Sequence, residues 1–116
     1  MSPQRSNRDQ ILDGTLRCLA RLPLEQVTAR VIAKEAGANP ASVIYHFGSK
    51  DELVTTAIIE GLDRWLDEVS QRLAGVEATR PAARFERAQA VITETRASHA
   101  ELVRNFIAAL ARAPHD

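Results

Sequence analysis

The chain has little of what holds secreted domains together or anchors a protein in a membrane. A single cysteine, Cys18, among 116 residues excludes an internal disulfide and fits a reducing compartment. No apolar run is long enough to cross a bilayer, and the opening residues, MSPQRSNRDQ, lack the apolar core of a signal peptide. These absences predict a soluble, cytoplasmic protein with no membrane partner.

Glycine and proline are also scarce, at five residues each, which argues against a loop-rich or disordered chain. No strand signals, repeats or low-complexity tracts occur. The hydrophobic content of 45% is enough for a core, and the many Ala, Leu, Arg and Glu residues favour helices. We therefore expect one small all-α protein.

No catalytic pattern is visible. The sequence has no Ser/His/Asp or Cys/His arrangement, no glycine-rich phosphate loop and no pair of acids at a recognisable spacing. The three histidines, His46, His99 and His115, are far apart and have no cysteine or acid at ligand spacing, which argues against a metal site. We expect no enzyme activity and no cofactor.

The net charge of zero hides an asymmetry between the two halves of the chain. Residues 1–50 carry seven Lys or Arg and four Asp or Glu, a net charge of +3, whereas residues 51–116 carry eight and eleven, a net charge of −3. A basic front and an acidic rear suit a protein that presents one end to a polyanion.

Three short helices are predicted in the basic half. Apolar residues at helical spacing predict the first over residues 7–21, with Pro23 just beyond it. Thr28 is a good N-cap for the second helix, flanked by a hydrophobic staple of Val27 and Ile32, and Gly37 ends it. The third helix begins with Asn39 as its N-cap and Pro40 in its first turn, and it runs to about His46.

Three further helices are predicted in the acidic half. Ser49 with Glu52 reads as a capping box for a long amphipathic helix from Lys50 to about Leu73. Residues 75–80 form a loop, and Pro81 opens a fifth helix, with apolar residues on one face: Phe85, Ala88 and Ile92. Ser98 with Glu101 reads as the capping box of a sixth helix, which frays at Pro114. The aromatic side chains expected in the core are Trp65, Phe85 and Phe106.

Two runs, RDQILDGTLRCLA and VTARVIAKEAGANPASVIYHFGSKDEL, resemble the N-terminal domain of TetR-family transcriptional regulators. The resemblance covers residues 8 to about 70 and rests on a Thr-x-x-x-Ile-Ala-x-x-Ala-Gly segment followed by Tyr-His-Phe-x-Ser-Lys-x-x-Leu. This chain departs from the family pattern at a few positions: Pro23 replaces a glycine, Ala38-Asn39 replaces Val-Ser, Ala41-Ser42 replaces Gly-Thr, and Ile44 replaces a tyrosine.

The resemblance implies a three-helix N-terminal bundle with a helix-turn-helix over residues 1–49. A long linking helix and two further helices of a truncated C-terminal domain follow over residues 50–116. In the family, the longer C-terminal domain pairs two subunits and binds a small effector. We therefore expect a sequence-specific DNA-binding regulator, usually a repressor released by a small molecule, acting on a palindromic operator as a homodimer of the longer parent. The alternative is a helical protein–protein interaction module that does not bind DNA.

The candidate DNA-binding residues gather at helix starts, where free backbone N–H groups favour phosphate. Arg30 and Lys50 each place a cation in a first helical turn, where it opposes the helix dipole, so neither has a local structural reason. By resemblance, Arg30 meets a guanine edge or a phosphate, and Lys50 and Tyr45 hold phosphates. The full set comprises Thr28, Arg30, Asn39, Ser42, Tyr45, His46 and Lys50.

Each candidate also has a structural interpretation. Thr28 and Asn39 act as caps in any case, and Arg30 or Lys50 can be an ordinary solvated cation. Tyr45 can be a half-buried ring and His46 a packing or capping residue. Cys18 falls at an apolar position of the resembled pattern, which predicts a buried and inert thiol.

Overall fold

The computed structural model describes residues 7–74 and 80–112, and within these ranges the chain is helical and contains no strand. The all-α expectation is therefore confirmed. In chain order the elements are α1 (Asn7–Leu19), the 3-10 turn η1 (Leu24–Gln26), α2 (Ala29–Ala36), α3 (Pro40–Phe47), α4 (Lys50–Ala74), α5 (Pro81–Arg96), the 3-10 turn η2 (Ala97–His99) and α6 (Ala100–Arg112). None of the helices in the described ranges is long and apolar enough to cross a membrane.

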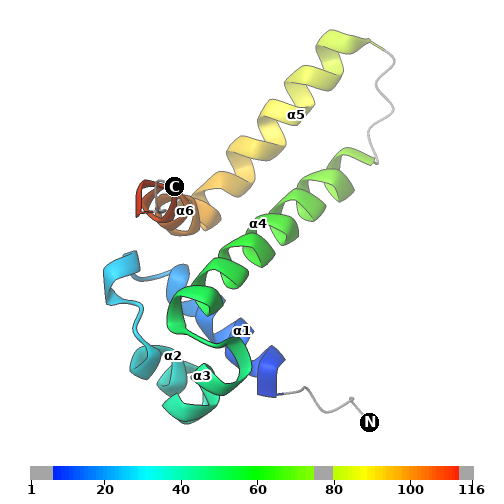
Figure 1. The fold of residues 1–116 in the computed structure, drawn as a ribbon. Helices are drawn as coiled ribbons and strands as arrows, with labels where there is room; N and C mark the ends of the chain where they lie inside the picture. The colour runs from blue at the N-terminus through cyan, green and yellow to red at the C-terminus, as the bar shows by residue number, and fades with distance from the viewer. Residues whose placement is uncertain (1–6, 75–79, 113–116) are drawn as a thin grey trace, which may run out of the picture.

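The first three helices form a compact bundle at one end of the molecule (Figure 1). The long helix α4 begins in this bundle and extends away from it, and α5 returns antiparallel to α4. The last helix, α6, lies across the junction and contacts α1, η1 and α4. The bundle thus packs against both the start of α4 and α6.

The core lies where α1, α2, α3 and the first half of α4 meet. Its fully buried side chains come from every one of these helices and from the segment before α2: Ile11, Leu19, Val27, Ile32, Val43 and Leu53. It continues past residue 50 through Val54, Ala57 and Ile58 and reaches Leu102 on α6. One apolar cluster therefore holds the bundle to α4 and α6.

Two glycines permit close helix packing. A Cβ at Gly14 would lie 2.7 Å from the Cβ of Ala36, so α1 and α2 approach each other at a point where no side chain fits. A Cβ at Gly61 would lie 2.8 Å from Leu102 Cδ2 and 2.9 Å from Leu16 Cδ2. Helix α4 therefore passes against both α1 and α6 at Gly61.

The predicted caps of α2 and α3 are confirmed. Thr28 Oγ1 accepts the N–H of Val31 at 3.2 Å, and Asn39 Oδ1 accepts the N–H of Ser42 at 2.9 Å. Gly37 ends α2 with φ of +70°, in the left-handed region that favours glycine. These caps fix a tight connection of three residues between α2 and α3.

The capping box at the start of α4 is only half formed. Ser49 Oγ accepts the N–H of Glu52 at 3.0 Å, as predicted. The Glu52 side chain is exposed and makes no return bond to the Ser49 N–H in the described structure. A serine cap alone therefore starts this helix.

The end of α1 is satisfied by a residue far away in sequence. Helix α1 stops at Leu19, two residues earlier than expected, and its Leu19 carbonyl cannot receive the usual bond from residue 23 because Pro23 has no N–H. Asn105 on α6, which is 2% exposed, donates its Nδ2 to Leu19 O at 2.8 Å and to Leu22 O at 3.0 Å. A buried amide thus ties α6 to the bundle.

The predicted capping box at Ser98 is wrong. The backbone runs from α5 through η2 into α6 in right-handed helical geometry, so the start of α6 has no N-cap for Ser98 to provide. The Ser98 hydroxyl instead donates to the carbonyl of Thr95 at 2.9 Å. A serine followed by a glutamate three residues later signals a cap only where the preceding helix has stopped.

The apolar face predicted for α5 is not the buried one. Phe85 is 65% exposed, which contradicts its assignment to the core, and Ile92 is also exposed. The buried residues of α5 are Val91 and Thr95, because α5 turns toward α4 the side on which Thr95 Oγ1 accepts the indole N–H of Trp65 at 2.7 Å.

Trp65 and Phe106 are partly buried, as expected of packed aromatic side chains. The Trp65 ring stacks on the imidazole of His99, with ring centroids 5.1 Å apart and planes 10° from parallel. Phe106 packs against the core cluster. The joint between α4, α5 and α6 is therefore built around Trp65.

Candidate nucleic-acid interface

Arg17 of α1 and Arg21, which follows this helix, pair with Glu35 of α2. Arg17 Nε and Arg21 Nη2 lie 2.9 and 3.0 Å from the two carboxylate oxygens of Glu35, and Arg17 Nη2 also donates to the Glu35 backbone carbonyl at 3.1 Å. The hydrogen bonds from Arg17 and Arg21 lower the pKa of the Glu35 carboxyl from its ordinary value. These two cations of the basic half are thus engaged in ion pairs within the bundle, although their side chains remain exposed.

Helix α3 has one buried side and one open side. Val43 is fully buried and Phe47 is partly buried, as the sequence predicts. Tyr45 is 85% exposed, so its ring projects into solvent, and the half-buried interpretation of this tyrosine is wrong. His46 is partly buried and meets the Tyr45 ring edge-on, with centroids 5.3 Å apart. Ser42, in the first turn, is partly buried as well.

Helix α2 presents cations on its outer side. Arg30 is exposed and makes no hydrogen bond or ion pair with any residue that the structure describes. Its guanidinium donors are therefore available to a ligand. Thr28 is exposed as well and caps the same helix end through the N–H of Val31.

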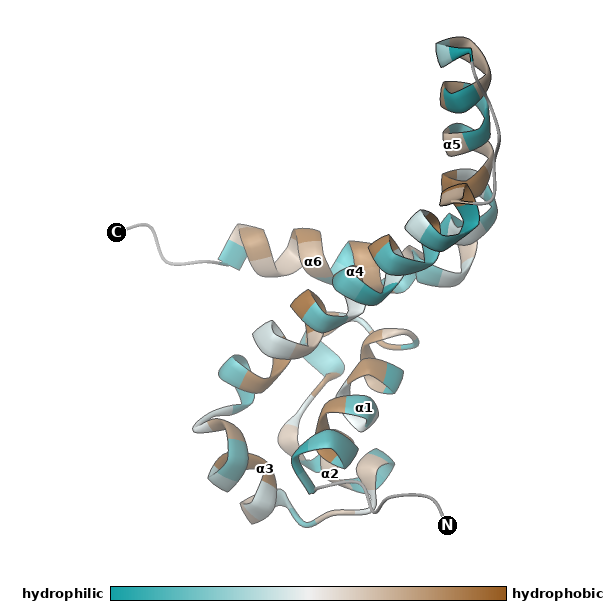
Figure 2. Cartoon of the chain, turned by 90° about the vertical axis from the view of Figure 1, so that its right-hand side faces the viewer, coloured by the Kyte–Doolittle hydropathy of each residue, from teal (hydrophilic) through white to brown (hydrophobic). Residues whose placement is uncertain are grey.

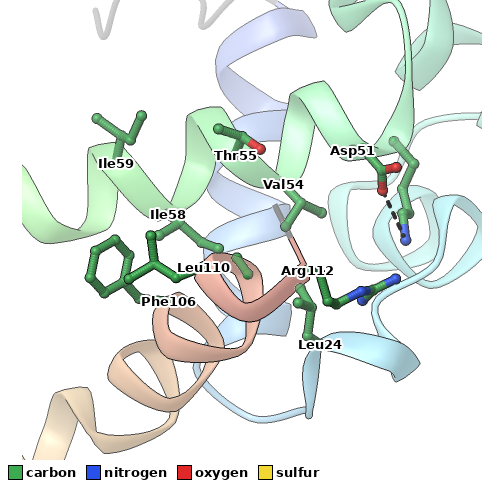
Figure 3. Close-up of a pocket in the computed structure, with 11 residues that line it drawn as sticks. Leu24, Asp51, Val54, Thr55, Ile58, Ile59, Phe106, Leu110 and Arg112 are labelled. Atoms are coloured by element: carbon green, nitrogen blue, oxygen red, sulfur yellow. Dashed lines mark ion pairs between the residues drawn. The ribbon is translucent and has the colours of Figure 1, made fainter. Parts of the chain in front are cut away.

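Lys50 begins α4 next to the end of α3. Its Nζ lies 3.5 Å from Asp51 Oδ1, and the Asp51 side chain is 87% exposed (the dashed line in Figure 3). A pair of this length with so exposed a partner contributes little to stability. The ammonium can therefore exchange its carboxylate for another anion at small cost.

Two cations and one apolar side chain join this surface without having been predicted. Lys34 lies one turn after Arg30 on α2, is exposed and has no ion pair within the described ranges. The i,i+4 spacing of Arg30 and Lys34 is the signal that identifies it. Arg8 lies over the Phe47 ring, 5.0 Å from its centroid, and brings a cation from α1 to the end of α3; no local pattern predicts this contact. Ile44 is 46% exposed beside Tyr45.

The Cys18 thiol has no chemical role at this surface. It is buried, and its Sγ lies 4.0 Å from the carbonyl of Val31. Burial, followed by the nearby Glu35 charge, raises the pKa of the thiol, which keeps it protonated. Among residues 7–74 and 80–112, no three His, Cys, Asp or Glu side chains are grouped so that they could hold a metal ion, and His115 lies outside these ranges.

Comparison with known proteins agrees with this geometry. Residues 11–57 match the family described as bacterial regulatory proteins, tetR family. Over 73 residues the chain is 34% identical to the HTH-type nicotine-responsive transcriptional repressor HdnoR of Paenarthrobacter nicotinovorans, a match that covers 63% of this chain and 38% of the relative. Over 66 residues it is 30% identical to the HTH-type transcriptional repressor AcnR of Corynebacterium efficiens, covering 57% of this chain and 35% of the relative.

The matched segment thus spans little more than a third of the curated relatives. Residues 11–57 contain most of α1, all of α2 and α3 and the start of α4, and they include Arg30, Lys34, Tyr45 and Lys50. Residues 11–57 of the chain belong to the tetR family of bacterial regulatory proteins.

Proposed function

We propose that the chain is a sequence-specific DNA-binding regulator of transcription, acting as a repressor. The observation that supports this best is that some cations of the bundle are held in ion pairs whereas others are not. Arg17 and Arg21 share an ion pair with Glu35, whereas Arg30 and Lys34 make no ion pair with any described residue and lie exposed on α2. Unpaired cations on α2, together with the exposed Tyr45 on α3, suit a phosphate backbone.

In the proposed complex, α3 enters the major groove with its first turns foremost, as recognition helices do. Ser42 and Tyr45 face the bases and the groove wall, and the exposed Ile44 offers an apolar contact for a thymine methyl group. His46 supports the Tyr45 ring. Asn39 caps the start of α3, which is the end of the helix that would meet the DNA.

The flanking residues hold the two DNA strands. Arg30 and Thr28 lie at the start of α2 and would meet one strand, with Arg30 on a phosphate or a guanine edge. Lys50 at the start of α4 would exchange Asp51 for a phosphate of the other strand. Each such phosphate contact releases counterions, so affinity should fall with salt by a log–log slope of about 0.9 per contact.

We propose residues 1–49 as the DNA-binding domain and residues 50–116 as the linking helix with part of an effector and dimerisation domain. A longer parent would act in the cytoplasm as a homodimer on a palindromic operator and would release it when a small effector binds. Exposed apolar side chains on α4, α5 and α6 support further packing in this half: Leu66, Phe85, Ile92, Ile107 and Leu110. The continuous core across residue 50 supports transmission from that half to the bundle.

Selection of bound duplexes from a random pool tests the proposal, followed by titration of the best site at several salt concentrations. We expect an enriched half-site and a negative salt slope. Lys50→Ala should weaken binding to every duplex by a similar factor and reduce the slope by about one. A flat salt slope and no enriched sequence would favour the alternative of a protein–protein interaction module.

A further inference from the structure

A groove lies between the first turns of α4 and the last turns of α6, beside η1 (Figure 3). Its volume of about 480 Å³ is within the range of small-molecule sites. Its walls are apolar and come from three elements: Val54, Ile58 and Ile59 of α4, Phe106 and Leu110 of α6, and Leu24 of η1. Ile59 and Leu110 are more than half exposed, so an apolar occupant would remove apolar surface from water.

One end of this groove is polar and positively charged. Arg112 lines it and makes no ion pair or hydrogen bond with the residues that the structure describes. Figure 3 shows its side chain extending toward the end of the groove where Lys50 pairs with Asp51. Two cations and one carboxylate leave a net positive charge, and the N-terminus of the 25-residue helix α4 adds to it.

We propose that this groove binds an organic anion with an apolar body. The anionic group would receive the Arg112 guanidinium, which can hold a carboxylate through two parallel N–H bonds. The Lys50 ammonium would be the second donor, turning from the exposed Asp51 carboxylate to the ligand. The apolar body would lie along Ile58, Phe106 and Leu110, where the walls of the groove offer no polar partner.

The site also has a regulatory consequence, which rests on the proposed function. Lys50 lines the groove and is also a proposed phosphate contact of the DNA-binding surface. One ammonium cannot serve both anions fully, so a bound ligand would weaken the grip on DNA. The ligand would further fix α6 against the start of α4, next to the bundle.

Decanoate is a suitable probe, with decan-1-ol and decylammonium as matched neutral and cationic controls. Calorimetric titration of the chain without DNA should detect decanoate binding and much weaker binding of both controls. Amide resonances of Thr55, Ile59 and Leu110 should shift. Arg112→Gln should weaken decanoate binding by about tenfold, the worth of a charge-assisted hydrogen bond. Arg104→Gln is the control, because Arg104 lies on the same helix but pairs with Glu101 at 2.7 Å.

Three results would overturn the anion site. Decan-1-ol could bind as tightly as decanoate, Arg112→Gln could leave the affinity unchanged, or the resonance shifts could spread over α5 rather than the groove. A second copy of the chain as the true occupant would appear as a dimer in sedimentation that Leu110→Gln dissociates and decanoate does not. Circular dichroism of each variant establishes that the fold is intact.

A separate titration with a fluorescent duplex tests the competition for Lys50. Decanoate should weaken DNA binding by the unchanged chain, whereas Arg112→Gln should bind DNA normally and lose this sensitivity. If decanoate binds and DNA affinity stays constant, the competition is refuted and the anion site stands. If the chain binds decanoate but no duplex at all, the proposed DNA-binding function fails independently of the groove.

Discussion

The N-terminal bundle and the helices that follow it are stabilised in different ways. Local caps fix the starts of α2 and α3, and α1, α2 and α3 each have side chains fully buried in one core. In α5 only Val91 and Thr95 are buried, and Phe85 and Ile92 remain exposed. Figure 2 shows apolar segments recurring along α5 and α6, outside the bundle. The comparison shows that many buried side chains hold the bundle together, whereas α5 depends on a few specific contacts.

The largest contrast should appear on removal of equivalent side chains from the two regions. Ile32→Ala in α2 should lower the free energy of unfolding by about 2–5 kcal/mol, because a fully buried side chain leaves a cavity. Ile92→Ala in α5 should cost less than about 1 kcal/mol, because nearly half of that side chain is exposed. Urea denaturation measures both. Equal losses would show that α5 is packed as tightly as the bundle.

The Asn105 amide should contribute to the free energy of unfolding by tying α6 to the bundle. Asn105→Ala should cost about 1–3 kcal/mol, because two buried carbonyl oxygens, those of Leu19 and Leu22, lose their donor. Asn105→Asp should cost at least as much, since it keeps the size of the side chain but faces these oxygens with a carboxylate. An aspartate tolerated better than alanine in urea denaturation would mean that Asn105 only fills space.

Removal of a single cation should weaken DNA binding when the cation lies in the bundle, but not when it lies in α5. Arg30→Ala should weaken binding to the best site by about 1–3 kcal/mol if Arg30 contacts a base, and should weaken all sequences equally if it contacts a phosphate. Arg84→Ala is the matched control: Arg84 lies in the first part of α5, is exposed and makes no side-chain contact with the described residues. Fluorescence anisotropy with several duplexes measures both. A similar loss for Arg84→Ala would assign the effect to overall charge.

The smallest effect should be a pH dependence confined to the bundle. The pKa of Glu35 is lower in the folded chain than its ordinary value of 4.5, so its ion pairs stabilise the fold above that pH. This stabilisation should fade as the pH falls through the lowered pKa. Melting temperatures of the unchanged chain and Glu35→Gln should therefore differ at neutral pH and converge in acid. Glu86→Gln on α5, where Glu86 is exposed and unpaired in the described structure, should show no such convergence.

Local signals predicted the bundle well, because caps and glycine stops act within four residues. Thr28, Gly37 and Asn39 perform the predicted roles. The errors in the second half have two physical causes. Ser98 was misassigned because the helical backbone continues from α5 into α6, and Phe85 because the side of α5 that packs on α4 carries Val91 and Thr95, whose hydroxyl bonds the distant Trp65.

At the candidate DNA-binding surface, too, local spacing predicts some features, whereas others depend on contacts between distant residues. The outward direction of Tyr45 follows from helical spacing once Val43 and Phe47 are taken as buried. The engagement of Arg17 and Arg21 with Glu35, and of Arg8 with Phe47, depends on how α1 packs against α2 and α3. A count of charges along the chain could not separate these cations from Arg30 and Lys34.

The stack of Trp65 on His99 makes the molecule its own spectroscopic reporter. The chain has one tryptophan and one tyrosine. The indole sits in the joint of α4, α5 and α6, whereas the phenol projects from α3 into solvent. Indole emission should therefore respond to movement of the joint, and phenol absorbance to events at α3. Unlabelled protein can thus reveal which region moves first.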